Sequence, residues 1–149
     1  MSRLQLNMPP KFWYSTEMDI HVGYVNYAGH LGNDAVLALA NEARMRFIGE
    51  LGYTEANVEG WGMVTADAAV IYTAEAFRGD VLTVEVGCTD FSAKGCDICY
   101  RFSRNHDGCE IARAKTGIVF FDHETREPVA VPKAFIEKTA GHLDRGGHS

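Results

Sequence analysis

Apolar residues recur every three to four positions between residues 34 and 51, which is typical of an α-helix with one buried face. Asn33 is a good N-cap residue, and Asp34 adds a negative charge in the first turn, where the helix dipole favours it. Gly52 follows where a left-handed residue commonly ends a helix. The pattern predicts one long helix, whose buried stripe comprises Val36, Leu39 or Ala40, Ala43, Phe47 and Leu51.

Five other segments alternate between apolar and polar residues, as half-buried strands do. The first precedes the helix and places Met18, Ile20 and Val22 on one face. The other four follow the helix and are separated by hairpin signals rich in glycine and polar residues. The predicted strands span residues 17–22, 63–76, 81–91, 95–104 and 110–122, and a short helix is predicted over residues 132–139.

One strand, one long helix and four antiparallel strands predict an α+β fold of the hotdog type, with the five-stranded sheet wrapped around the helix. A single helix cannot cover both faces and both edges of such a sheet, so we expect an oligomer. The expected organisation is an N-terminal lead-in over residues 1–14, one domain over residues 15–140 and a frayed tail over residues 141–149.

Composition narrows the choice of partners. The 149 residues carry 14 Lys and Arg against 20 Asp and Glu, a net charge of −6 that disfavours nucleic acid as a partner. No apolar run reaches the roughly 18 residues that span a bilayer, and the N-terminus lacks the layout of a secretion signal. We expect no membrane contact and a cytoplasmic location.

The four cysteines include a C-x-x-C pair, Cys96 and Cys99, which raises the question of a metal or redox site. Both residues lie on a predicted strand, where an offset of three places their side chains on opposite faces. This geometry is poor for joint ligation of a metal. We therefore expect reduced, structural cysteines and no metal.

Two motifs carry a resemblance to a known family. They are the loop 25–33, whose sequence is VNYAGHLGN, and the helical motif 41–44, whose sequence is NEAR. Together with the turns at residues 77–80 and 92–94, these motifs resemble the 4-hydroxybenzoyl-CoA thioesterase branch of the hotdog superfamily. The likeness extends over about residues 17–136. It implies hydrolysis of acyl-CoA thioesters without a cofactor, by dimers, often paired into tetramers, with active sites between subunits.

One position departs from that resemblance. The branch usually has a catalytic Asp three residues before the glycine of the loop, where this chain has Asn26. An amide cannot act as a base or as a carboxylate nucleophile. In an enzyme, Asn26 can still orient a water or the substrate. The alternative is a non-catalytic protein that binds an acyl thioester. A hotdog dehydratase typically presents a His with a carboxylate in a different loop motif, which is not found here.

Thioester hydrolysis needs a donor for the developing oxyanion and a group that activates water. The resemblance assigns the donor to the main chain of Asn33 at the helix start. The candidate bases are His30, Asp34 and Glu42, since an imidazole titrates near neutrality and carboxylates accept protons. Their structural alternatives are loop packing for His30, a solvated first-turn carboxylate for Asp34 and an i,i+4 ion pair with Arg46 for Glu42. Asp67 is a further candidate, from a neighbouring subunit.

Coenzyme phosphates require cations. Lys94 lies in the turn that resembles the coenzyme-contacting hairpin of the family and is the first choice. Arg78, Arg101 and Arg104 follow, and each is also explained as ordinary surface charge. Tyr24, Tyr27 and Trp61 are candidates for an acyl pocket, although core packing or subunit contact explains them equally well.

Overall fold

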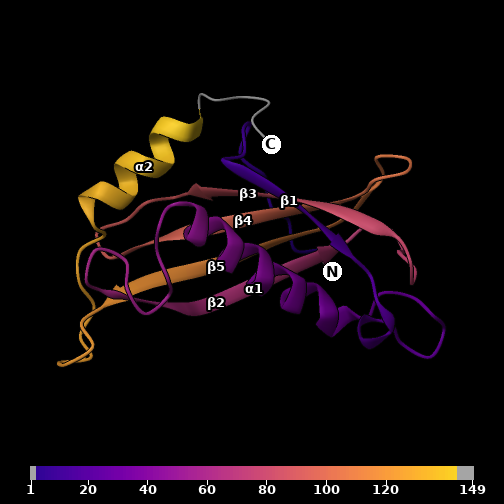
Figure 1. Cartoon of the computed structure of the whole chain (residues 1–149), viewed down its shortest axis with the longest axis horizontal. Helices are drawn as coiled ribbons and strands as arrows, with labels where there is room; N and C mark the ends of the chain where they lie inside the picture. Colours follow the sequence, from indigo (N-terminus) through magenta and orange to yellow (C-terminus); the bar gives the residue numbers. More distant parts are fainter. Residues whose placement is uncertain (1–2, 144–149) are drawn as a thin grey trace.

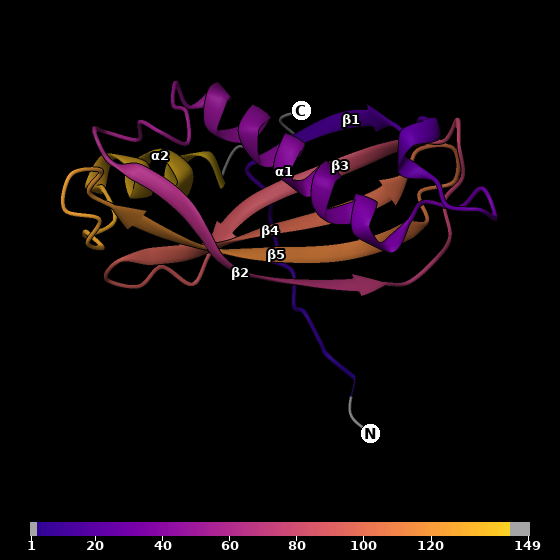
Figure 2. The same ribbon diagram turned by 90° about the horizontal axis from the view of Figure 1, so that it is seen from below.

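In this computed structural model, which describes residues 3–143, a five-stranded antiparallel sheet curves around one long helix, as predicted (Figure 1). The helix α1, Asn33–Glu50, lies along one face of the sheet, and no helix of the described residues lies on the opposite face (Figure 2). The strands are β1 Tyr14–Asp19, β2 Gly62–Tyr72, β3 Val81–Thr89, β4 Gly95–Arg104 and β5 Glu110–Phe121, in the spatial order β1-β3-β4-β5-β2.

The order of the strands leaves two free edges. The strand β1 pairs with β3 rather than with β2, so β1 and β2 each have one neighbour in the sheet. The register of the β2–β5 pair shifts between Thr65 and Asp67, which marks a bulge in the edge strand. The element order and the hotdog arrangement are those predicted.

The first strand lies earlier in the chain than predicted. Asp19 pairs with Val81, the first residue of β3, so the segment that follows Asp19 has no ladder partner. Ile20 is buried, and its amide donates to the Asp80 carbonyl, while Val22 begins a 3-10 turn and is 66% exposed. The prediction that Val22 continues a buried strand face is therefore wrong.

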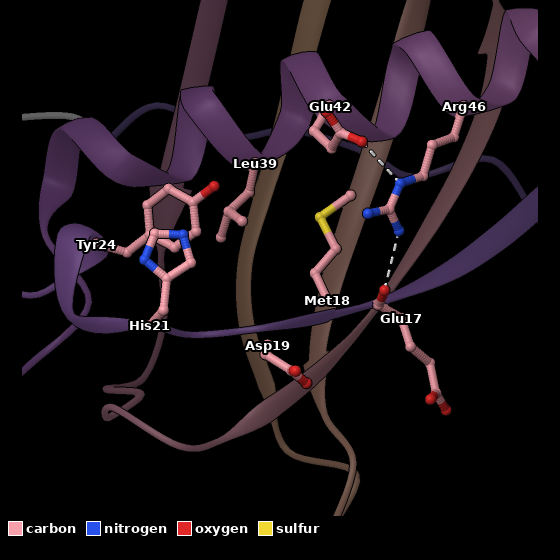
Figure 3. Close-up of a pocket in the computed structure, with 8 residues that line it drawn as sticks. All are labelled: Glu17, Met18, Asp19, His21, Tyr24, Leu39, Glu42 and Arg46. Carbon is pink, nitrogen blue, oxygen red and sulfur yellow. Dashed lines mark hydrogen bonds and ion pairs between the residues drawn. The ribbon is translucent and has the colours of Figure 1, made fainter.

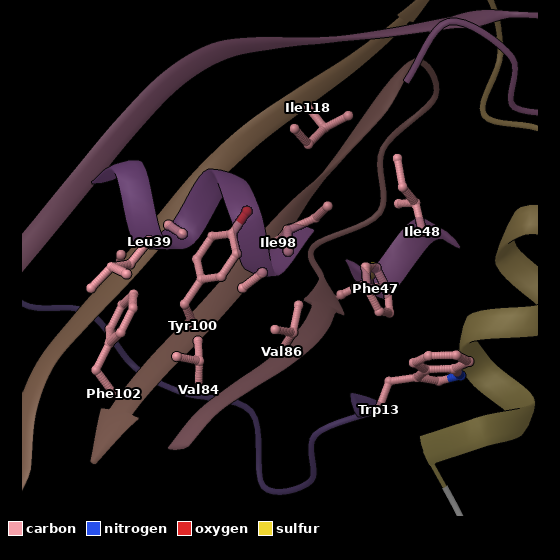
Figure 4. Packing of buried hydrophobic residues seen from close by; sticks show 14 of the residues in the cluster. Trp13, Leu39, Phe47, Ile48, Val84, Val86, Ile98, Tyr100, Phe102 and Ile118 are labelled. Carbon is pink, nitrogen blue, oxygen red and sulfur yellow. The ribbon is translucent and has the colours of Figure 1, made fainter. Parts of the chain in front are cut away.

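The core lies between α1 and the concave face of the sheet (Figure 4). Phe47 of α1 meets Trp13 edge-on, with the ring centroids 4.9 Å apart, and both side chains are buried. Tyr100 and Phe102 of β4 pack beneath the helix and are inaccessible to solvent. Burying aromatic side chains of this size dominates the stability of a domain core. The predicted stripe of α1 is buried from Val36 to Leu51.

Arg44, the last residue of the helical motif, is buried and joins three parts of the fold. Its guanidinium donates to the Glu55 carboxylate at 2.8 Å, to the Tyr100 hydroxyl at 3.2 Å and to the Asn41 side chain at 3.0 Å. A buried charge is stable only when its donors are satisfied in this way. Arg44 therefore fixes the position of α1 over β4.

The N-terminal segment contacts side chains on the convex face of the sheet and extends away from it toward the N-terminus (Figure 2). The Leu6 carbonyl accepts from Arg113 of β5 at 2.9 Å, and the Arg101 guanidinium lies 4.8 Å from the centre of the Phe12 ring. Trp13 and Tyr14 then enter the core and β1. The segment predicted as a loose lead-in thus contacts the sheet.

The C-terminal helix α2 spans Lys133–Leu143, beyond the predicted end at residue 139. It packs at one end of the sheet, where Phe135 is buried and the Lys138 carbonyl accepts from the Trp13 indole at 3.2 Å. All four cysteines are unbridged, and Cys96 and Cys99 project from opposite faces of β4, as predicted. Within residues 3–143, neither helix is long and apolar enough to cross a membrane.

Candidate active site

A cavity of about 180 Å³ opens where α1 begins. Its lining comes from three parts of the chain, namely the loop before α1, the end of β2 with the segment that follows it, and the start of β5. Three of the predicted site residues, Asn26, His30 and Asn33, line this cavity. Two further polar residues, Tyr72 and Glu75, also line the cavity, and no sequence motif marks either of them.

The helix start supplies unpaired donors to this region. Gly32 is the N-cap residue with an extended backbone, and Asn33 is the first helical residue, so the prediction of an Asn33 cap is wrong. The Gly32 carbonyl accepts from the Ala35 amide at 3.1 Å, so the helical hydrogen bonds begin one residue earlier than predicted. A Cβ atom at Gly32 would lie 2.8 Å from the Asp34 carboxylate, which favours glycine there. Within the described residues, no group accepts from the backbone amides of Asn33 and Asp34.

Asn26 organises the loop. Its side-chain oxygen accepts from the backbone amides of Ala28 at 3.0 Å and His30 at 3.2 Å. Its backbone amide donates to the His30 carbonyl, and Gly29 closes the turn with φ +80°, a conformation that suits glycine. The Asn26 side chain thus holds the loop that presents His30, and an amide oxygen is sufficient for that role.

His30 contacts two residues from the segment after β2. Its Nδ1 atom lies against the Glu75 carboxylate, and its ring meets Phe77 edge-on with the centroids 4.8 Å apart. The His30 side chain is one-third exposed and that of Glu75 is more open, so solvent reaches both. The cavity therefore contains a histidine, His30, whose Nδ1 atom faces the carboxylate of Glu75.

Tyr72 connects the sheet to the helix start. Its hydroxyl donates to the Asn33 carbonyl at 2.7 Å. Burial, and secondly the negative charge of Asp34, raise the pKa of Tyr72, because both disfavour the phenolate. The residue therefore remains a neutral donor and holds the first turn of α1 in place.

The remaining candidate bases lie elsewhere. Asp34 does not line the cavity, and its carboxylate folds back over Gly32. Glu42 lines a second hollow between α1 and β1, where it accepts from Arg46 at 2.9 Å (Figure 3). This is the i,i+4 ion pair that the sequence offered as an alternative. Asp67 pairs with Lys115 on the convex side of the sheet.

The predicted coenzyme cations are widely separated. Arg78 is exposed in the turn that follows Glu75, and no carboxylate in the described chain pairs with it. Lys94 lies at the opposite end of the sheet, and its amine donates to the Pro128 carbonyl at 3.4 Å. Arg101 pairs with Glu85, and Arg104 donates to the carbonyl of Glu75.

The predicted aromatic residues do not line the cavity. Tyr24 stacks on His21 beside the second hollow, Tyr27 is fully exposed, and Trp61 lies just before β2, at the far end of that strand. No group of three or more His, Cys, Asp or Glu side chains between residues 3 and 143 is arranged to hold a metal ion.

The fold and this cavity define a protein of the hotdog class. A sequence model of the Thioesterase-like superfamily matches residues 20–139, and the chain belongs to this family. The resemblance is thereby confirmed for the superfamily, and assignment to the 4-hydroxybenzoyl-CoA branch stays a prediction. Among curated proteins, none matches the chain.

Solved structures share the fold over most of their length. The 1,4-dihydroxy-2-naphthoyl-CoA thioesterase from Synechocystis is 22% identical, with a TM-score of 0.78 over 88% of this chain and 97% of that one. A hypothetical protein from Staphylococcus aureus, solved in complex with CoA, is 16% identical, with a TM-score of 0.80 over 97% and 92%. A DHNA-CoA thioesterase from Staphylococcus aureus is also 16% identical, with a TM-score of 0.74 over 88% and 90%.

Proposed function

We propose that this protein hydrolyses an acyl-CoA thioester to a free acid and coenzyme A in the cavity where α1 begins. The observation that carries the proposal is that one cavity is lined by His30 and by Asn33, whose backbone amide has no acceptor within the described residues. The next amide of the helix start, that of Asp34, is also without an acceptor there. Thioester hydrolysis needs this combination of an oxyanion donor and a proton acceptor. Membership of the Thioesterase-like superfamily supports the same reaction.

The helix start is suited to the charge that develops on the carbonyl oxygen. Backbone amides at the first turn point away from the helix, and the helix dipole favours negative charge there. Tyr72 keeps this turn fixed through its hydrogen bond to the Asn33 carbonyl. Donors that are already oriented stabilise a transition state without reorganising during the reaction.

The active assembly that we propose is a dimer paired through β2. This strand has 11 residues and a single neighbour in the sheet. Apart from the Met63 amide, which donates to the Glu55 carbonyl at 2.8 Å, its outer side can pair with a second copy. Two-fold pairing is antiparallel and places the Gly62 end of one β2 beside the Tyr72 end of the other. Lys94, which lies at the Gly62 end of its own sheet, then approaches the partner's cavity.

Arg78 is a better-supported phosphate contact than Lys94. The Lys94 side chain shares a shallow hollow with the carboxylates of Asp67, Asp90 and Asp97, which oppose the approach of an anion. Arg78 forms no ion pair with a carboxylate of the described chain, and it lies three residues after Glu75, which lines the cavity. A free guanidinium beside the cavity suits the phosphates of coenzyme A.

The test measures the hydrolysis of short, long and aromatic acyl-CoAs. A thiol-reactive dye detects the free thiol of coenzyme A as it is released. Turnover of any member of the panel is the expected result. Binding without turnover, measured by calorimetry on the same panel, would instead show that the protein holds a thioester and that the amide at position 26 has ended catalysis. Sedimentation of the same sample tests the dimer, and a monomer would contradict it.

A further inference from the structure

Glu75 occupies a position whose role no sequence motif indicates. Of the residues that line the cavity, it is the one with a carboxylate, and His30 is the one with an imidazole. The two groups contact each other through Nδ1 of the ring. We propose that Glu75 is a positioning residue that orients His30 as the general base for water, an inference that rests on the proposed hydrolase function.

The meeting of these two residues is built into the backbone. The amide of Leu31 donates to the Ala76 carbonyl at 2.8 Å, and His30 forms an antiparallel bridge with Phe77. These contacts join a loop before α1 to a segment more than forty residues further along the chain. The relative position of His30 and Glu75 is therefore set by main-chain hydrogen bonds and does not depend on chance contact of two surface side chains.

A second set of contacts, from the end of β4 and from the turn after Phe77, holds the Glu75 segment in place. Arg104 at the end of β4 donates to the Glu75 carbonyl at 2.6 Å, and its guanidinium is itself held by the Asp107 carboxylate at 2.8 Å. The Phe77 amide donates to the Asp80 carboxylate at 2.9 Å, which closes the following turn. The backbone of the Glu75 segment is therefore held in place on both sides of the residue.

The contact determines which ring nitrogen can act as a base. A carboxylate accepts hydrogen bonds and does not donate them, so the proton of neutral His30 lies on Nδ1, facing Glu75. The lone pair is then on Nε2, which makes no hydrogen bond within the described residues. Glu75 also stabilises the imidazolium that forms when Nε2 takes a proton.

The resulting step conserves atoms and charge. His30 Nε2 removes a proton from water as the water oxygen bonds to the thioester carbonyl carbon, and the carbonyl oxygen becomes an oxyanion near the amides of Asn33 and Asp34. Collapse of this intermediate breaks the carbon–sulfur bond. The thiolate of coenzyme A leaves and receives the proton from the His30 imidazolium, which restores the starting state. No oxidant or cofactor enters.

The kinetic test compares Glu75→Gln, His30→Gln and the double variant, with Glu50→Gln as the control. Glu50 is an exposed carboxylate at the far end of α1, outside the cavity. We expect each of the first two substitutions to lower kcat by about 10²-fold, with KM within about threefold of the wild-type value. Glu75→Asp is expected to recover part of the loss, because it restores the charge.

The double variant decides whether Glu75 acts through His30. If it does, removing Glu75 from a protein that already lacks His30 costs little, and the double variant stays within about threefold of His30→Gln. Independent action instead multiplies the two losses and overturns the proposal. Wild-type kcat in Glu75→Gln also overturns it.

A spectroscopic measurement separates this proposal from the proposed function. Nitrogen NMR of histidine-labelled protein, at a pH that leaves the ring neutral, distinguishes the two tautomers, and His30→Gln identifies the signal among the six histidines. We expect the Nδ1–H tautomer in the wild type and its loss in Glu75→Gln. The Nε2–H tautomer in the wild type overturns the inference. A wild type that hydrolyses no acyl-CoA overturns the proposed function, whereas the hold of Glu75 on His30 is then decided by the tautomer alone.

Discussion

Two hollows lie beside α1, and each contains a histidine and at least one carboxylate. At the helix start, the Nδ1 atom of His30 faces the Glu75 carboxylate, which accepts a hydrogen bond from it. In the hollow against β1, the Nδ1 atom of His21 accepts from the Gly23 amide at 3.1 Å. Neutral His30 therefore carries its proton on Nδ1 and neutral His21 carries it on Nε2. Of these two histidines, only His30 has its lone pair on Nε2.

The two hollows also differ in how far their polar groups are satisfied. Beside β1, the Arg46 guanidinium donates to the Glu42 carboxylate and to the Glu17 carbonyl (Figure 3). It also donates to the Thr16 hydroxyl. At the helix start, the amides of Asn33 and Asp34 have no acceptor among residues 3–143. The two hollows have similar polar residues, and the feature that distinguishes the proposed active site is its unused donors and acceptors.

The strongest test of this comparison exchanges one histidine at a time. We expect His30→Gln to lower kcat for acyl-CoA hydrolysis by about 10²-fold, because the proposed general base is lost. His21→Gln removes a histidine of the other hollow and should leave kcat within about threefold. Steady-state kinetics with the same substrate compare the two variants. Equal losses would show that the two hollows are not functionally distinct.

A smaller effect is expected from the link between the sheet and the helix start. Tyr72→Phe removes the hydroxyl that donates to the Asn33 carbonyl. One hydrogen bond contributes about 1 kcal/mol, so a helix start that is less well held should lower kcat by about fivefold. Tyr14→Phe, on β1, is the matched control, and thermal unfolding checks that both variants are folded. An unchanged kcat in Tyr72→Phe would remove this residue from the mechanism.

Glu42→Gln probes the hollow against β1. The Glu42–Arg46 pair is nearly half exposed, and such i,i+4 pairs contribute at most about 0.5 kcal/mol to stability. We expect a small decrease in the free energy of unfolding, measured with urea, and a hydrolysis rate within about twofold of the wild type. A tenfold loss of rate with normal stability would instead identify Glu42 as the base.

The smallest effect concerns the titration of Tyr72, whose pKa is raised by burial and then by the charge of Asp34. Since the raised pKa favours the protonated phenol, its hydrogen bond is fully present below the ordinary tyrosine range and is lost only as pH rises through the raised value. The phenolate absorbance of wild type minus Tyr72→Phe isolates this titration. Asp34→Asn should shift it to lower pH, and no shift would exclude the charge effect.

The sequence predicts those parts of the molecule in which one local rule decides the structure. The stripe of α1 was predictable because Val36, Ala43 and Phe47 recur at the helical period and all face the sheet. The end of β1 was not predictable, because Ile20 and Val22 continue the alternation although β3 begins opposite Asp19. The length of the partner strand, which the local pattern does not contain, sets that boundary.

The candidate site divides in the same way. Asn26, His30 and Asn33 lie within one short loop and helix start, so their proximity is readable from the chain. Tyr72 ends β2, Glu75 lies in the segment that follows it, and neither residue has a motif of its own. The signal that could have found them is the turn at residues 77–80, which implies that the preceding strand ends close by. Only the backbone contact between Leu31 and Ala76 shows which loop it meets.

The contact between Leu31 and Ala76 also has a consequence for the order of folding. The loop that carries His30 precedes its partner segment by more than forty residues, and the cavity includes Ile111 from a strand later still. During synthesis, the site cannot close until that strand has left the ribosome, long after α1 is able to form. Activity is therefore expected to appear late in folding. It should require the long-range pairing of the sheet strands and should not accompany the formation of helix. In refolding experiments, recovery of activity should follow the tertiary signal of Trp13 and lag behind the helical signal.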